Sequence, residues 1–278
     1  MGQHRFLLYR SSPTLLLLLL LILAVAAATS DRTPPTAPSV IPQSIRGTAV
    51  ARLVSTAYVA TVAVATPAVL YASRVDTDKE STLRNELFSR ITPRSKVLEV
   101  GFGASGSGAN LNYYPCDISL TALDVRIADE EGESGRQAAL TGAYSVKNID
   151  VALKKGNVEN MGPLFKDDSF DVVTSSLLLC SVNSPAAAIA EITRVLKKGG
   201  HYLSVEHILS DNDRLMRWQQ RLLTPLQVVL ADNCHLDRQT DKLFASANGG
   251  LEIVDMKFET FGSQYPISRQ IYTVLRKT

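Results

Sequence analysis

The fold is decided by the stretch Val97-Leu98-Glu99-Val100-Gly101-Phe102-Gly103-Ala104-Ser105-Gly106-Ser107-Gly108. It is a short apolar run that carries one acid and then breaks into a glycine-dense loop. The next apolar run closes at a second acid, Asp124. This layout is typical of the first strand-to-helix turn of a doubly wound sheet, where a nucleotide-type cofactor binds.

Apolar periodicity extends this pattern along the chain. It predicts strands over 96–100, 120–124, 149–153, 170–176 and 201–206, and helices over 81–91, from 108, over 126–145, 186–196 and 214–230. Two late strands, 251–261 and 270–276, are expected to pair as a terminal hairpin. Strands that alternate with helices predict an α/β protein, with a doubly wound, mostly parallel seven-stranded sheet.

Composition excludes several classes of protein. The chain has 278 residues, of which 45% are hydrophobic and 20% charged, so it can bury a sizeable core. Its net charge of +2 is uneven, because residues 1–75 hold six Arg, no Lys and one acid, which gives +5 there and −3 in the remainder. A mildly acidic body gives no support for a nucleic-acid partner. Three widely spaced cysteines lack the spacing of a metal site, so no metal is expected.

The first 75 residues are predicted to direct the protein to its compartment. Residues 1–30 have a basic start and the apolar run Leu15–Ala28, typical of a signal peptide or signal anchor. Residues 31–75 combine a Pro-rich linker with the uncharged segment Leu53–Tyr71. That segment is interpreted as a membrane helix, with a transit peptide or a helix packed on the body as alternatives. Residues 76–278 form the remaining, catalytic domain.

The two acids narrow the class of cofactor. Glu99 lies beside the glycine loop, where a carboxylate would repel a phosphate but would accept hydrogen bonds from an ammonium or a hydroxyl group. Asp124, at the end of the next strand, is placed to accept both hydroxyls of a ribose. An acid at each position fits S-adenosylmethionine, which is cationic and carries an amino-acid end, better than it fits a dinucleotide.

Further blocks carry a family resemblance. The chain resembles class I S-adenosylmethionine-dependent methyltransferases of the methyltransferase-11 type in Asp124 and in the segments 97–103, 156–161, 168–173 and 194–200. It resembles one narrower group, the methyltransferase-like 7 family, in the segments 85–89, 109–115, 179–182, 206–207 and 232–234. That family consists of membrane-anchored proteins of the endoplasmic reticulum and lipid droplets, whose animal members methylate alkyl thiols. The resemblance implies a Rossmann-like methyltransferase domain over 76–278.

The resemblance also implies a set of cofactor-binding residues. They are Glu99, Gly101, Gly103, Gly106, Asp124, Asn157, Val158, Leu179 and Cys180. The loop is longer than the family's Gly-x-Gly-Thr-Gly, so Gly106 and Gly108 are alternatives for the third glycine. Asn157 replaces an Asp that is frequent in the broad group.

Residues outside the cofactor set have weaker assignments. His207 is the candidate catalytic base or substrate contact, although a hydrogen-bonded structural histidine is the more common case. Cys180 and Cys234 are candidates for lining the pocket, although a buried cysteine is more commonly a small hydrophobe. Trp218 and the apolar residues at 222, 223, 228 and 230 are interpreted as core, with a lid over an apolar substrate as the alternative.

The expected function is methyl transfer from S-adenosylmethionine to a small lipophilic acceptor, an alkyl thiol first. The alternatives are C- or O-methylation of a quinone, phenol or lipid, and a non-catalytic membrane-associated protein with a degenerate methyltransferase fold. The expected location is a membrane of the endoplasmic reticulum or a lipid droplet, reached through residues 1–75. A plastid or mitochondrion is the alternative location.

Overall fold

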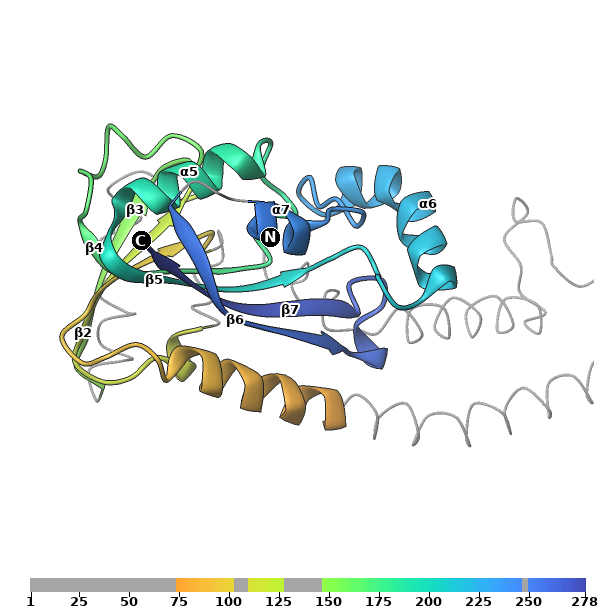
Figure 1. Ribbon diagram of the computed structural model, residues 1–278, viewed down its shortest axis with the longest axis horizontal. Coiled ribbons are helices and arrows are strands. Elements are labelled where there is room, and N and C mark those ends of the chain that lie inside the picture. The colour runs from red at the N-terminus through yellow and green to blue at the C-terminus, as the bar shows by residue number, and fades with distance from the viewer. Residues whose placement is uncertain (1–73, 103–109, 128–146, 247–249) are drawn as a thin grey trace, which may run out of the picture. The chain divides into compact units, whose positions relative to one another are not determined.

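The computed structural model describes residues 74–102, 110–127, 147–246 and 250–278 (Figure 1). Some predictions concern residues outside these ranges: residues 1–73, the loop glycines Gly103, Gly106 and Gly108, and most of the helix at 126–145. The chain divides into two compact units, one made of 1–79 with 262–265 and the other of 80–261 with 266–278. The second unit contains the sheet and the candidate site.

The sheet has seven strands in the order β3-β2-β1-β4-β5-β7-β6. The strands are β1 (Lys96–Val100), β2 (Ile118–Asp124), β3 (Ile149–Lys155), β4 (Phe170–Ser176), β5 (Leu196–His207), β6 (Leu251–Thr260) and β7 (Arg269–Lys277). The first five are parallel, and β7 runs antiparallel to both β5 and β6. The predicted seven-stranded α/β sheet and its terminal hairpin are therefore confirmed. The strand order reverses between β1 and β4, where open α/β sheets bind ligands.

Helices cover both faces of the sheet (Figure 1). A helix over residues 74–88 has its last turns on one face, while α5 (Pro185–Val195) and α7 (Thr240–Ser246) lie on the other. The helix α6 (Arg214–Leu230) follows the carboxyl end of β5. Among the described residues, none of the helices combines the length and the apolar character that crossing a bilayer requires.

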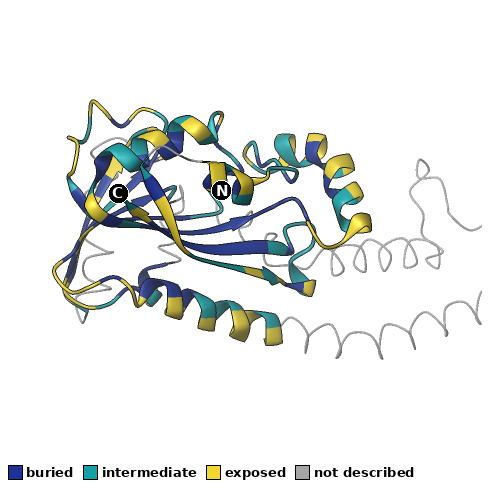
Figure 2. Cartoon of the chain, viewed as in Figure 1, coloured by how far each residue is buried: buried dark blue, intermediate teal, exposed yellow. Residues whose placement is uncertain are grey.

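Two hydrophobic clusters correspond to the two faces of the sheet. Side chains alternate between faces along a strand. Val97 and Leu203 accordingly join the cluster that contains Phe88, while Leu98 and Tyr202 join the cluster of α5 and α7. The buried strands stand out against the exposed outer faces of the helices in Figure 2.

The structure corrects three predictions of local structure. The helix expected from 108 is, over its described residues, only a 3-10 turn, η2 (Leu111–Tyr113), because Pro115 keeps Tyr114 extended. The helix predicted over 81–91 ends at 88. The helix predicted over 186–196 ends at Val195, and the residues expected to terminate it enter β5 instead, with Gly199 at a φ of 78°.

The prediction that α6 contributes its apolar residues to the core is confirmed for Leu223, which packs against a buried cluster, and is wrong for three others. Trp218, Leu222 and Leu230 are 61%, 62% and 73% exposed. The core contact of α6 is polar: the Gln220 side chain is fully buried and donates to the carbonyl oxygens of Ile208 and Pro266. Hydrogen bonds of Gln220 and Arg217 and a few partly buried side chains hold the helix, and its apolar stripe faces outward.

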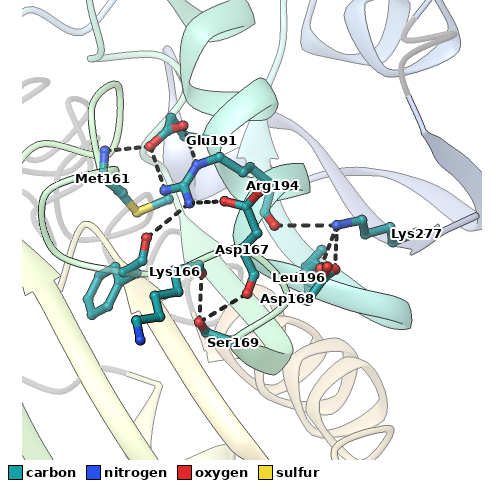
Figure 3. A network of polar contacts seen from close by, with 10 residues as sticks. Met161, Lys166, Asp167, Asp168, Ser169, Glu191, Arg194, Leu196 and Lys277 are labelled. Carbon is teal, nitrogen blue, oxygen red and sulfur yellow. Dashed lines mark hydrogen bonds and ion pairs between the residues drawn. The ribbon is translucent and has the colours of Figure 1, made fainter.

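The amino edge of the sheet is held by partly exposed ion pairs (Figure 3). Arg194 of α5 donates to Glu191 and Asp167, both at 2.7 Å, and to the carbonyl oxygen of Phe165 at 2.9 Å. Lys277 of β7 donates to Asp168 at 2.8 Å. These contacts fasten the loop that precedes β4 to α5 and β7.

Candidate active site at the carboxyl edge of the sheet

The chain turns sharply where β1 ends. Gly101 has a φ of 77°, and its N–H donates to the carbonyl oxygen of Leu123 at 2.8 Å. A Cβ at this position would lie 2.8 Å from Cδ1 of Leu178, which is closer than carbon atoms approach. Glycine is therefore required here both by conformation and by space. Of the predicted loop glycines, this is the one that the structure describes.

Glu99 lies buried just before this turn, with 4% of its surface exposed. Its Oε1 accepts a hydrogen bond from Nδ2 of Asn110 at 2.7 Å, and its Oε2 accepts one from the hydroxyl of Tyr114 at 2.9 Å. Burial raises the pKa of Glu99 to about 7, and these two hydrogen bonds limit the rise. Among the described residues none forms an ion pair with Glu99, since Arg84 donates to Asn110 instead. Each carboxylate oxygen keeps a lone pair for a further donor.

Asn110, Tyr114 and Arg84 have no role in the sequence-based prediction of the site. Asn110 links Glu99 to Ser176 at the end of β4, and Tyr114 also bonds Thr174 within β4, at 2.7 Å. The signal that was available is the placement of an amide and a phenol in a short segment after the glycine loop, beside apolar Leu111. Their partners are not apparent from spacing, because 60 to 66 residues separate them from β4.

Asp124 ends β2, the strand that pairs with β1, so its carboxylate lies on the same edge as Glu99. It is 6% exposed and accepts the backbone N–H of Arg126 at 2.9 Å. The Arg126 guanidinium lies 3.4 Å away and bonds Asp232 more closely, at 2.7 Å. The sheet thus brings the two predicted acids to neighbouring strand ends.

The segment after β3 lies beside Asp124. The N–H of Gly156 donates to the carbonyl oxygen of Asp124 at 3.1 Å. Asn157 Oδ1 accepts the N–H of Glu159 at 2.9 Å, which forms a local turn, and Val158 is buried. The predicted residues Asn157 and Val158 are therefore close to Asp124 along the same edge.

Glu206 at the end of β5 organises the chain after β4. Its Oε1 accepts the N–H groups of Leu178 and Leu179, both at 3.2 Å, and lies 3.1 Å from the hydroxyl of Ser175. Burial raises its pKa to about 7. This carboxylate holds the predicted cofactor residue Leu179, and both Leu179 and the next residue, Cys180, are buried. No sequence pattern indicated this role of Glu206.

His207 also lies at the carboxyl edge and is 1% exposed. Its Nε2 is 3.2 Å from Sγ of Cys234, while its Nδ1 is buried and has no hydrogen-bond partner among the described residues. The cysteine thiols 180 and 234 are free, and both are buried. The proximity of the two thiols lowers the pKa of Cys234 and raises that of Cys180.

The residues present fit an S-adenosylmethionine site in the chemistry of their donors. Two buried carboxylates stand at adjacent strand ends, and a residue that tolerates no side chain lies between them. Glu99 has no cation of its own among the described residues. This is the donor set that a cationic ligand with ribose hydroxyls requires, and it is unlike a phosphate site, which needs N–H groups and cations.

Comparison with known proteins agrees with this geometry. Residues 98–204 match the family model described as a methyltransferase domain. A putative methyltransferase from Bacillus halodurans C-125 has a similar fold, with a TM-score of 0.52 and 17% identity over 70% of this chain and 98% of that one. Fold and site together define a methyltransferase of the Rossmann-like class.

Two relatives define the family more closely. Thiol S-methyltransferase TMT1A of Homo sapiens is 30% identical over 177 residues, which cover 62% of this chain and 69% of that protein. Thiol S-methyltransferase TMT1B of Rattus norvegicus is 34% identical over 170 residues, 59% of this chain and 66% of that protein. The chain belongs to the family of these methyltransferases, and the match spans about two thirds of their length.

Proposed function

We propose that this protein transfers a methyl group from S-adenosylmethionine to a small lipophilic thiol. The observation that carries the proposal is the pair of buried acids, Glu99 and Asp124, at neighbouring strand ends beside Gly101. The names of the relatives TMT1A and TMT1B support a thiol as the acceptor.

The chain's own groups would hold the cofactor as follows. Glu99 would accept the ammonium hydrogens through the lone pairs that Asn110 and Tyr114 leave unused. Asp124 would accept the ribose hydroxyls, and Val158 would lie against the adenine beside Asn157. When bound, S-adenosylmethionine supplies a methyl group already activated on a sulfonium. The protein's task is then to position the acceptor and to exclude water.

A thiol acceptor needs little activation by the protein. An ordinary thiol has a pKa near 8.5, so a few per cent is thiolate at neutral pH and is strongly nucleophilic. A phenol or an activated carbon of a quinone would need a stronger base near the methyl group. A thiol is therefore the acceptor that this site serves with the fewest additional groups.

Association with a membrane is the second part of the proposal. The stripe Leu215, Trp218, Leu222, Leu226 and Val229 is 57–79% exposed and follows one face of α6. The helix also carries three Arg and no acid. Basic helices with an aromatic and aliphatic face lie in membrane interfaces. Such a helix, next to the carboxyl end of β5, would place the site close to lipophilic acceptors, and residues 1–75 would add an anchor.

The cofactor is tested by calorimetric titration of the full chain, in detergent, with S-adenosylmethionine. Saturable binding is expected, and Asp124→Asn should weaken it at least tenfold. The matched control is Asp150→Asn, because Asp150 is an exposed acid of the neighbouring strand β3. An absence of binding at millimolar cofactor would overturn the enzymatic function and favour a non-catalytic role.

The acceptor is tested by product analysis with an alkyl thiol, a phenol and a quinone, each at equal concentration. Methylation of the thiol above the other two supports the proposal, and preference for either of the others contradicts it.

Co-flotation with anionic vesicles should fall strongly in Trp218→Glu/Leu222→Glu. A fluorescent fusion of residues 1–75 distinguishes endoplasmic reticulum or lipid droplets from a plastid or mitochondrion.

A further inference from the structure

Three segments bring two cysteines and a histidine together at the carboxyl edge. Cys180 follows β4, His207 ends β5 and Cys234 follows α6. Their ligand atoms all lie within 4.8 Å of one another, and each residue is no more than 3% exposed. A chance meeting of three such side chains in a core is uncommon, because cysteine and histidine are among the rarer residues of this chain, with three and four copies.

The protein leaves the imidazole of this cluster incompletely bonded. Nε2 of His207 faces Sγ of Cys234 at 3.2 Å, but Nδ1 is buried without a partner among the described residues. A buried polar atom without a partner is destabilising. Around the cluster the packing is apolar, with Leu236 and the partly buried Leu223 and Ile267. The site therefore combines strong donors with a low local dielectric.

We propose that Cys180, His207 and Cys234 bind one Zn²⁺ ion. Two thiolates and a neutral imidazole are the soft and borderline donors that zinc prefers, and the two thiolates balance its charge. Zinc bonds of about 2.3 Å to sulfur and 2.0–2.1 Å to nitrogen place tetrahedral ligand atoms roughly 3.5–3.8 Å apart. The ligand atoms of the cluster lie within 4.8 Å of one another, so side-chain movements of about 1 Å would bring them to these spacings.

Three protein ligands leave one tetrahedral position for a water or a substrate, as in catalytic zinc sites. Here the inference rests on the proposed function, because the fourth ligand would be the acceptor thiol. The thiol would replace the zinc-bound water, so that a Zn–O bond breaks and a Zn–S bond forms. The S–H bond breaks at the same time and its proton passes to the departing water. The bound acceptor is then a thiolate, and no oxidation is involved.

The site is tested first by metal analysis of the full chain, purified in detergent without chelators. Close to one zinc per chain is expected in the wild type and in Cys116→Ser, the matched control, because Cys116 is exposed and outside the cluster. Zinc should be lost in Cys180→Ser, Cys234→Ser and His207→Gln. Replacement of zinc by Co²⁺ should give a sulfur-to-cobalt charge-transfer band that these three variants lack.

A second measurement does not depend on the folding of variants. Alkylation of the wild type followed by mass spectrometry should show positions 180 and 234 protected until a chelator is added, with Cys116 labelled throughout. Equal labelling with and without chelator would overturn the site. A Cys180–Cys234 disulfide in freshly purified protein would overturn it too, as would zinc retained by the three variants.

The role of the open position is tested separately. An alkyl thiol added to the cobalt protein should shift the charge-transfer band, and an unchanged spectrum would overturn the acceptor assignment. None of these metal readouts needs the cofactor or turnover. If zinc binds but no thiol is methylated, the proposed function fails and the metal site stands. If thiol methylation continues at full rate in zinc-free protein, the role in acceptor binding fails and the proposed function stands.

Discussion

The two edges of the sheet treat acidic residues in opposite ways. At the amino edge, the Arg194 guanidinium bonds Glu191 and lowers the pKa of that carboxyl, and Lys277 pairs with Asp168 near solvent. At the carboxyl edge, burial raises the pKa of Glu99 and of Glu206 to about 7, and neither forms an ion pair with a described residue. Ion pairs thus neutralise the acids that fasten loops at the amino edge, whereas Glu99 and Glu206 at the carboxyl edge are bound, within the described part of the chain, by hydrogen bonds alone. Of these two, Glu206 already accepts backbone N–H groups and is structural, whereas each carboxylate oxygen of Glu99 keeps a lone pair for a ligand.

The largest effect is expected for Glu206→Leu, which removes the acceptor for two backbone N–H groups and leaves the Ser175 hydroxyl less well bonded. Unsatisfied buried donors cost about 1–3 kcal/mol each, so the free energy of unfolding should fall by about 3 kcal/mol. Urea unfolding measures it. Glu206→Gln keeps an acceptor oxygen and should lose less than half as much. Equal losses in the two variants would show that the carboxyl edge does not depend on this acceptor.

A tenfold effect is expected for the pH dependence of cofactor binding through Glu99. Binding of an ammonium needs the carboxylate, and a pKa of about 7 makes this form scarce at pH 6. S-adenosylmethionine should therefore bind about tenfold more weakly at pH 6 than at pH 8, by calorimetry. Glu99→Gln should bind weakly with no dependence on pH in this range. A wild-type affinity that is flat between pH 6 and 8 would contradict the assignment.

The same residue gives a control in the absence of cofactor. The pKa of Glu99 is raised in the folded protein, so the folded state binds its proton more tightly than the unfolded state. Its contribution to stability is therefore most favourable below pH 4.5 and is lost as the pH rises to 7. Relative to the wild type, Glu99→Gln should gain stability over this interval, by up to about 1.4 kcal/mol per pH unit.

A smaller effect is expected at the amino edge for Arg194→Leu. The side chain is 24% exposed and bonds Glu191, Asp167 and the carbonyl oxygen of Phe165. Its loss should lower the free energy of unfolding by about 1–2 kcal/mol and leave cofactor affinity unchanged. Arg194→Lys keeps the charge but cannot span these partners, and it should recover only part of the loss. A fall in cofactor affinity would mean that the two edges are coupled.

The smallest effect is expected for Asp168→Asn. Asp168 is 60% exposed, and its partner Lys277 keeps its bond to the carbonyl oxygen of Leu196. Asn also tolerates the φ of 53° at this position. The free energy of unfolding should change by less than about 0.5 kcal/mol, and the change should shrink further in high salt. A larger change would contradict the view that exposed, ion-paired acids contribute less to stability than buried acids.

Much of the fold could be predicted from local pattern. The strands at 96–100 and 170–176 agree with β1 and β4 at both ends, because each is a short apolar run bounded by polar or turn residues. The helix and strand boundaries that were predicted wrongly depend on contacts with residues far away in the sequence. Lys197 was expected to end a helix, but it enters β5 and pairs with Asp171 of β4. Trp218, Leu222 and Leu230 of α6 have an apolar, core-like pattern but are exposed, because polar contacts of Gln220 and Arg217 hold the helix on the body.

The sequence by itself determined the order of strands and helices, the family, and the two acids at the ends of β1 and β2. These depend on residue type and on near neighbours along the chain. Only the tertiary structure decided which side chains meet: Asn110 and Tyr114 with Glu99, Glu206 with the loop after β4, and His207 with Cys180 and Cys234. His207 and Cys234 are 27 residues apart, a spacing that matches no metal motif. Parallel strands nevertheless deliver their carboxyl ends to one edge, whatever length of chain separates them.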